Sequence, residues 1–156
     1  MRWRELQLHV VRNHGFRAYA WGMPVFRTAQ RGMNPENRPE WSDVTAAGLF
    51  RIPTEGGRFD SHFHDCDEYW LIFEGRAKVR TEGREFYVQR GDIVCTRAGD
   101  EHDVLEVYET VEAFYFEGAM PAGGRVGHLH RDAAAAAGHD VPAIPLPNDF
   151  PDGGRS

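Results

Sequence analysis

The chain has 156 residues, of which 41% are apolar and 27% charged, and its formal net charge is −6. This length predicts one domain with one core, and this composition excludes a coiled coil and a largely disordered chain. The single lysine, Lys78, and the scattered arginines form no basic patch, so we expect no nucleic-acid partner. The longest apolar run, residues 69–73, is far too short to cross a membrane, so we expect no membrane partner either.

Two features indicate the compartment. Arg2 and Arg4 imitate the start of a signal peptide, but Glu5 interrupts the apolar stretch that such a peptide requires. The two cysteines, Cys66 and Cys95, cannot build a disulfide framework and fit a reducing compartment. We therefore expect a cytoplasmic protein.

The sequence divides into three stretches that we expect to belong to one domain. Residues 1–55 mix aromatic side chains with turn formers and predict N-terminal strands and loops. Residues 56–117 are more regular and predict the barrel core. Residues 118–156 are rich in proline, glycine and alanine, and predict a tail in which the alanines before Gly138 form one small helix.

Short strand-like runs are separated by turns that contain glycine or aspartate. In the first stretch they cover 16–21 and 44–52, the second interrupted at Gly48, and in the core they cover 69–74, 77–81, 85–89, 93–96, 103–108 and 111–117. Many short strands at regular intervals predict an all-β antiparallel sandwich or barrel. The spacing leaves no room for the helices that a parallel sheet requires.

Four side chains in the core stretch form a candidate metal site. His62 and His64 are two residues apart, so on a strand their imidazoles leave the same face while Phe63 points the other way. A turn at residues 65–67 would return Glu68 to them as an anionic third ligand. His102 follows a later turn and completes the set. Three imidazoles and one carboxylate suit one divalent ion of Fe, Mn, Zn, Ni, Co or Cu and leave coordination positions open.

The same residues carry a resemblance to the cupin superfamily. The first cupin motif has a glycine, five residues, His-x-His, three or four residues, a glutamate, six residues and a glycine; every position is matched, by Gly56, His62, His64, Glu68 and Gly75. The second motif is matched by Gly91, Gly99 and His102. Arg97 stands where that motif has proline and Glu106 where it has asparagine, and neither departure touches a ligand.

This resemblance implies a small single-domain cupin with a double-stranded β-helix, a jelly-roll-like barrel. It implies a metal held by His62, His64, Glu68 and His102, and a small-molecule substrate or ligand. In such centres the metal serves dioxygenases, sugar isomerases or epimerases, decarboxylases and other lyases, or binding and sensor proteins. We place dioxygenase-type oxidation first because an aromatic-rich barrel predicts a dry pocket, with Glu68 as the catalytic base.

Other residues have simpler interpretations. We interpret Cys66 as a turn residue that faces away from the metal, and Cys95 as a small apolar residue of a strand. His128 and His130 repeat the His-x-His spacing, but no partner motif accompanies them, so a solvated position or docking of the tail is favoured over a second metal site. Small cupins commonly pair through sheet edges or swapped N-terminal strands, which predicts a homodimer with residues 1–50 as candidates for the exchange.

Overall fold

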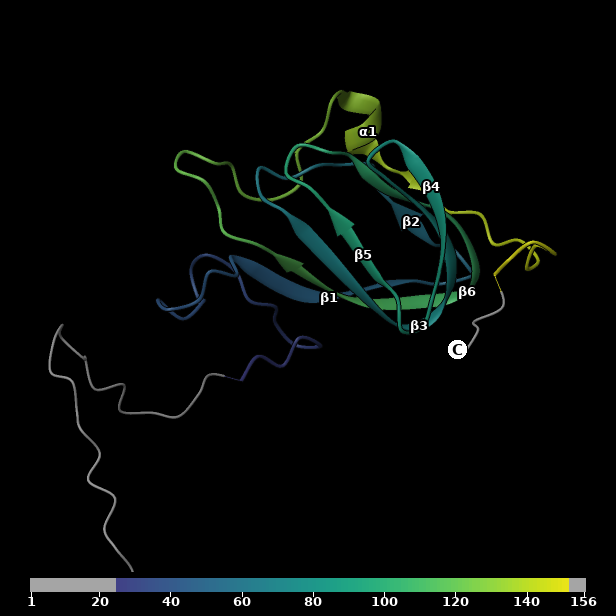
Figure 1. Ribbon diagram of the computed structural model, residues 1–156, viewed down its shortest axis with the longest axis horizontal. Coiled ribbons are helices and arrows are strands. Elements are labelled where there is room, and N and C mark those ends of the chain that lie inside the picture. Colours follow the sequence, from purple (N-terminus) through teal and green to yellow (C-terminus); the bar gives the residue numbers. More distant parts are fainter. Residues whose placement is uncertain (1–24, 152–156) are drawn as a thin grey trace, which may run out of the picture.

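The computed structural model describes residues 25–151, which form an all-β body with one short helix (Figure 1). The predicted strand at 16–21 lies outside the described residues. The elements in chain order are β1 (Ala46–Ile52), β2 (Arg58–Phe59), β3 (Glu68–Thr81), β4 (Arg84–Gln89), β5 (Ile93–Thr96), β6 (His102–Glu117), α1 (Ala133–Ala137) and β7 (His139–Asp140).

Two long strands, β3 and β6, organise the sheet. They run antiparallel from the pair Glu68 and Glu117 at one end to the pair Thr81 and His102 at the other. β1 pairs with the far edge of β6, while β4 and β5 follow one another along the free edge of β3. All these pairings are antiparallel, as the spacing of the turns predicted. A separate two-stranded sheet joins β2 to β7.

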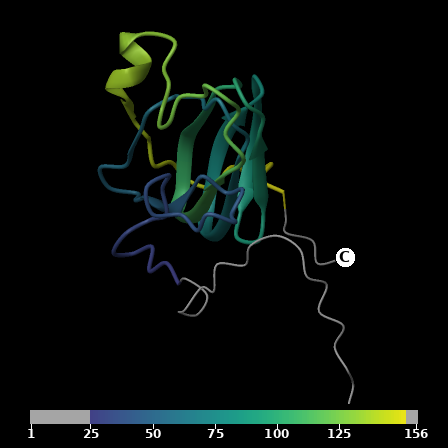
Figure 2. The ribbon, with the colours of Figure 1, turned by 90° about the vertical axis from the view of Figure 1, so that its left-hand side faces the viewer.

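The β3–β6 ribbon is curled rather than flat, as Figures 1 and 2 show. Thr96 pairs with Glu68 at the start of β3, yet its hydroxyl lies 2.7 Å from the hydroxyl of Thr81 at the end of β3. A straight strand between Glu68 and Thr81 would be about 40 Å long at 3.3 Å per residue. The strand must therefore bend back, and this closure forms the barrel.

A glycine permits this bend. The register between β3 and β6 shifts on both sides of Gly75, whose φ of 84° is one that L side chains rarely adopt. A Cβ atom at this position would overlap the carbonyl oxygen of Thr110. The turn predicted between 69–74 and 77–81 is therefore wrong: the glycine bends one continuous strand instead of separating two.

Two further strand predictions need similar corrections. The runs at 103–108 and 111–117 are one strand, β6, and Gly48 does not interrupt β1. At Gly48 a Cβ would collide with the ring of Tyr115, so this glycine makes room for a neighbouring side chain. A glycine in a strand-like sequence can thus mark close packing of a neighbouring side chain as well as a break in the strand.

Side chains that alternate along the strands fill the barrel. The buried core comprises Ile52, Trp70, Ile72, Ala77, Val79, Val88, Val94, Val104, Val107, Val111, Ala113 and Val141. Among the aromatic residues of β3 and β6 only Trp70 is buried, whereas Tyr69 and Phe114 are exposed on the outer face of the sheet. The period of two in a strand puts residues 69 and 70 on opposite faces.

The tail folds onto the barrel instead of extending away from it. The predicted helix is α1, which begins after the N-cap Asp132 and ends at Gly138. Beyond it, Val141 is buried and its amide donates to the carbonyl of Gly57. Between residues 25 and 151 no helix combines the length and apolarity needed to span a membrane.

Candidate metal centre

Backbone pairing places the two histidines of the His-x-His sequence. His62 forms an isolated antiparallel bridge with His102, and Phe63 forms one with Leu129 on its other side. The segment is therefore extended through bridges rather than through a long strand, and the imidazoles of His62 and His64 still leave the same side. Gly99 N–H donates to the carbonyl of His64 at 2.8 Å and ties it to the turn before His102.

Closure of the barrel brings Glu68 to His102. Glu68 pairs with Glu117 at one end of the β3–β6 ribbon, whereas His102 lies at the other end. Because the ribbon curls, Glu68 Oε2 nevertheless lies 2.8 Å from His102 Nε2. The structure thus brings together all four residues that the sequence singled out.

The four side chains converge as ligands around one ion would. One ligand atom from each of His62, His64, Glu68 and His102 lies within 4.8 Å of the other three. His102 Nε2 is 2.9 Å from His62 Nε2, and His64 Nε2 is 3.6 Å from Glu68 Oε2. Bonds of about 2.1 Å to a common ion, at right angles to one another, would place neighbouring ligand atoms about 3 Å apart.

Unpaired buried atoms support this arrangement. All four residues are at most 5% exposed, yet His64 Nε2 and Glu68 Oε2 have no hydrogen-bond partner. The 2.8 Å approach of His102 to Glu68 is close without being aligned as a hydrogen bond. Buried polar groups are normally paired, so a cation in contact with these atoms would remove an energetic cost.

Protonation states also suit metal binding. Burial, and then the nearby His102 and His128, lower the pKa of His62 to about 3, and burial lowers the pKa of His64. Burial alone would raise the pKa of Glu68, but the contact with His102 and the proximity of His64 and His62 together outweigh burial, and the pKa is lowered. His62 and His64 therefore offer neutral imidazoles, and Glu68 a charged carboxylate, at neutral pH.

The tautomer of His62 is set by the backbone. Its Nδ1–H donates to the carbonyl oxygen of Asp60 at 2.6 Å. In a neutral imidazole the other nitrogen then carries the lone pair, so Nε2 of His62 faces the cluster as a ligand.

A cavity of about 320 Å³ opens beside the cluster. His62 and Glu68 form part of its wall, and most of the rest is aromatic; the lining is completed by Phe50, Phe59, Trp70, Tyr115, Glu117, Gly127 and His128. Phe50 and Phe59 each pack against Trp70, with ring centroids 5.1 and 5.6 Å apart. The cavity can thus hold the apolar part of a small molecule next to the candidate ligands.

Glu117 is a carboxylate on this wall that sequence reasoning missed. It is 7% exposed, and its Oε1 lies 3.9 Å from His64 Nδ1. Burial, and then the charge of Glu68, raise its pKa. The signal that could have identified it is the antiparallel pairing of β3 with β6, which puts Glu117 opposite Glu68.

Residues 125–131, here called the strap, run past the cluster and carry His128. The Arg125 side chain donates to both carboxylate oxygens of Asp65 at 2.8 Å, and Arg131 donates to the carbonyl of Gly99 at 2.6 Å. Between these anchors the His128 ring stacks on His62, with centroids 3.6 Å apart and planes at 5°. The predicted docking of this segment is thus observed, and its docking site is the candidate metal centre itself.

The two cysteines lie away from the ligand positions. Cys66 is buried with its sulfur 3.9 Å from Glu117 Oε2, and burial first of all raises its pKa to about 11. It is therefore a thiol at neutral pH, which is a poor ligand. Cys95 is exposed, which corrects the expectation of a packed apolar residue.

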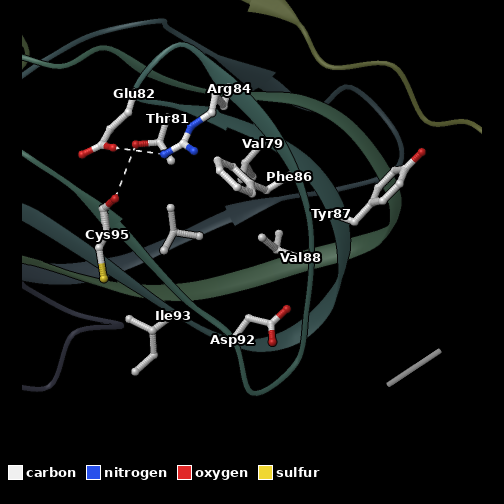
Figure 3. Close-up of a pocket in the computed structure, with 11 residues that line it drawn as sticks. Val79, Thr81, Glu82, Arg84, Phe86, Tyr87, Val88, Asp92, Ile93 and Cys95 are labelled. Carbon is white, nitrogen blue, oxygen red and sulfur yellow. Dashed lines mark hydrogen bonds and ion pairs between the residues drawn. The ribbon is translucent and has the colours of Figure 1, made fainter. Parts of the chain in front are cut away.

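Cys95 lines a second hollow, of about 460 Å³, between β4 and β5 (Figure 3). Val79, Phe86 and Ile93 contribute to its apolar surface, and none of the four candidate ligands reaches it. The smaller cavity beside the cluster is therefore the one with the chemistry of an active site.

Comparison with known proteins identifies the barrel. A family model described as a cupin domain matches residues 48–116. This region of the chain is therefore similar to a cupin domain. The matched cupin region includes all four members of the histidine and glutamate cluster, which could hold a metal.

Further comparisons concern individual proteins. The uncharacterized protein y4oW of Sinorhizobium fredii is 48% identical over 71 residues, which are 46% of this chain and 33% of that protein. The chain thus matches about a third of the length of this curated relative. The DMSP lyase DddQ of Ruegeria pomeroyi is 22% identical with a TM-score of 0.50, covering 58% of this chain and 44% of that chain.

A cupin protein of Bacteroides fragilis is 16% identical with a TM-score of 0.48, covering 70% of this chain and 90% of that chain. At such identities the likeness to solved structures concerns the fold alone.

Proposed function

We propose that this cupin is a mononuclear metal-dependent enzyme acting on a small organic molecule, with dioxygenase-type oxidation as the first reaction to test. The observation that supports it best is the buried cluster of three histidines and Glu68 beside an aromatic-walled cavity. A divalent ion of Fe, Mn, Zn, Ni, Co or Cu would supply open coordination positions and, for iron or copper, redox chemistry.

The chain's own residues would then bind and orient the substrate. Phe50, Phe59 and Trp70 form an apolar wall that excludes water from one side of the cavity. Glu68 both belongs to the ligand set and is the predicted catalytic base, because its carboxylate reaches the cavity. A molecule held against this wall would have its reacting atoms next to Glu68.

Glu117 favours a second candidate, a non-redox isomerase, epimerase or lyase. Such reactions need a group that moves a proton while the ligand set stays intact. Glu117 lies on the cavity wall and outside the ligand set, so it could take that role while Glu68 remains bound.

Elemental analysis followed by activity screening tests the proposal. We expect the purified chain to carry iron or copper, and to consume O₂ when offered small aromatic or enolic compounds. Zinc, no O₂ consumption, and isomerase or lyase turnover lost in Glu117→Gln would favour the second candidate. Glu112→Gln is the matched control, because Glu112 lies on the same strand in a surface ion pair with Arg51. A metal-loaded protein that shows neither O₂ consumption nor isomerase or lyase turnover would contradict the proposed enzymatic activity and indicate a binding or sensor protein.

A further inference from the structure

We propose that the cavity beside the metal centre selects small molecules that carry a methylated ammonium group, which would bind among the aromatic rings next to Glu117. This inference rests on the proposed function in one respect, since the other end of the same molecule would react at the metal. Four of the nine described residues that line the cavity are aromatic and two are acidic, and none is an arginine or a lysine. The lining therefore attracts a positive charge and offers no permanently charged group to an anion.

Two carboxylates stand opposite each other where the cavity meets the sheet. Glu117 on β6 pairs with Glu68 on β3, and like charges directly opposite one another destabilise a ladder. A metal ion would neutralise Glu68 but would leave Glu117, which is 7% exposed. Within residues 25–151 no arginine or lysine forms an ion pair with Glu117, whose contact of this kind is with His64 Nδ1 at 3.9 Å. A buried carboxylate without a close cation is costly, so a positively charged ligand would stabilise this side chain.

Phe50, Phe59 and Trp70 form an aromatic corner in this cavity rather than a stack. The planes of Phe50 and Trp70 meet at 66°, those of Phe59 and Trp70 at 76°, and those of Phe50 and Phe59 at 59°. Tyr115 pairs with Trp70 across the ladder, two residues before Glu117, and so lies on the same face of the sheet. The face of each ring carries negative partial charge, so rings at steep angles can surround one cation.

The cation–π contacts of the protein leave this corner to a ligand. In the described part of the chain, arginine and lysine side chains lie over four rings, and none of these rings lines the cavity: Phe63, Phe86, Tyr87 and Phe150. The described residues therefore supply no cation of their own to the aromatic corner. A methylated ammonium suits the corner better than a primary one, because aromatic walls accept few hydrogen bonds and methyl groups require none.

Calorimetric titration of the full-length protein, with the metal that it carries, tests the inference with two probes, choline and its neutral isostere 3,3-dimethylbutan-1-ol. The probes share their shape and hydroxyl group and differ in the positive charge. We expect choline to bind about tenfold more tightly than the isostere. Glu117→Gln should weaken choline binding about tenfold and leave the isostere unchanged. Glu112→Gln, on the same strand but in the surface ion pair with Arg51, should change neither affinity.

Phe59→Leu keeps an apolar side chain but removes the ring, and should weaken choline about fivefold while it spares the isostere. Phe86→Leu is its control, since Phe86 lines the other hollow, between β4 and β5 (Figure 3). Far-UV circular dichroism of each variant separates loss of binding from loss of fold.

Equal affinity for the two probes, no binding of choline, or an unchanged choline affinity in Glu117→Gln would overturn the ammonium site. Choline binding by a protein that turns over no small molecule would support the ammonium site while refuting the proposed enzyme. Turnover of neutral or anionic compounds by a protein that does not bind choline would support the enzyme and overturn the ammonium site.

Discussion

His62 contacts three parts of the site: the backbone at Asp60, the other cluster residues and the strap. Its Nδ1–H is committed to the Asp60 carbonyl, its Nε2 faces His102, and its ring face is covered by His128. An imidazole constrained on both nitrogens and one face has little freedom to rotate. We infer that the orientation of the ligand set is established before a metal binds, which lowers the entropy cost of binding.

The contact between the partly exposed His139 and the buried Asp103 gives a pH-dependent prediction. His139 Nε2 lies 2.7 Å from Oδ1 of the buried Asp103, whose other oxygen accepts from Arg80. Burial lowers the pKa of His139, but the hydrogen bond to Asp103 and its charge outweigh burial, so the pKa is raised above 6.5. A raised pKa in the folded state contributes stability below the ordinary pKa, and this stability is lost as the pH rises through the folded value.

His139→Gln should therefore lower the melting temperature more at about pH 6 than at about pH 9. Thermal unfolding of the wild type and the variant at both pH values measures this difference. An equal loss at both pH values would show that the contact with Asp103 does not depend on the charge of His139.

Three of the four ligand residues were predictable because their arrangement is local, whereas His102 was identified through its match to the second cupin motif. The period of two along an extended chain places His62 and His64 on one side, and a bend of three residues returns Glu68. Glu117 and Asp60 were not predictable in the same way. Glu117 enters the site through strand pairing across the sheet, and Asp60 through contacts with the distant strap.

At the scale of elements, the bend in β3 decides whether the cluster can form. Gly75→Ala would place a Cβ atom against the carbonyl of Thr110 at a φ that alanine disfavours. We expect a loss of about 3 kcal/mol or more in the free energy of unfolding, together with weaker metal binding. Chemical denaturation and metal titration measure the two effects.

Gly83→Ala is the matched control for this substitution. Gly83 also has a positive φ, 71°, but a Cβ atom there would have nothing within 4 Å. It should lose about 1 kcal/mol, from backbone strain alone, with unchanged metal binding. Equal losses in the two variants would show that the contact with Thr110 does not matter to the bend.

The turns at the ends of the strands explain which of the predicted strand bounds are confirmed. β5 has the predicted bounds because the turns on both sides of it lie outside the hydrogen-bonded ladder that β5 forms with β3. β3 and β6 are each longer than predicted because Gly75 lies inside the ladder, and neighbouring strands keep both halves paired. A glycine in the sequence does not reveal whether a turn or a bulge follows.

At the scale of the whole molecule, the outer face of the sheet carries exposed apolar side chains. One row of apolar side chains crosses four strands in register: Leu49, Phe114, Leu71 and Ile93. Three of them are exposed, Ile93 by 61%, and Tyr69 extends the surface. We propose that a second copy of the chain covers this face, because an exposed apolar row can be buried against the same row of a second copy across a two-fold axis.

Leu71→Glu should then convert a dimer to a monomer in sedimentation experiments. Leu146→Glu is the control, since Leu146 is similarly exposed but lies in the tail. A wild type that sediments as a monomer would contradict the dimer. A dimer that persists in Leu71→Glu would contradict this interface and favour exchange of residues 1–50, much of which lies outside the described part of the chain.

The central claim is that three histidines and Glu68 bind one divalent metal at the point where the barrel closes. Metal content and binding stoichiometry of the wild type, His64→Ala and His102→Ala test this most directly. Neither of the two substituted histidines forms a hydrogen bond with Asp60 or with the histidines of the strap. The account predicts one equivalent lost in both variants, with His139→Ala unchanged. Equal metal binding in the wild type and both variants would contradict it.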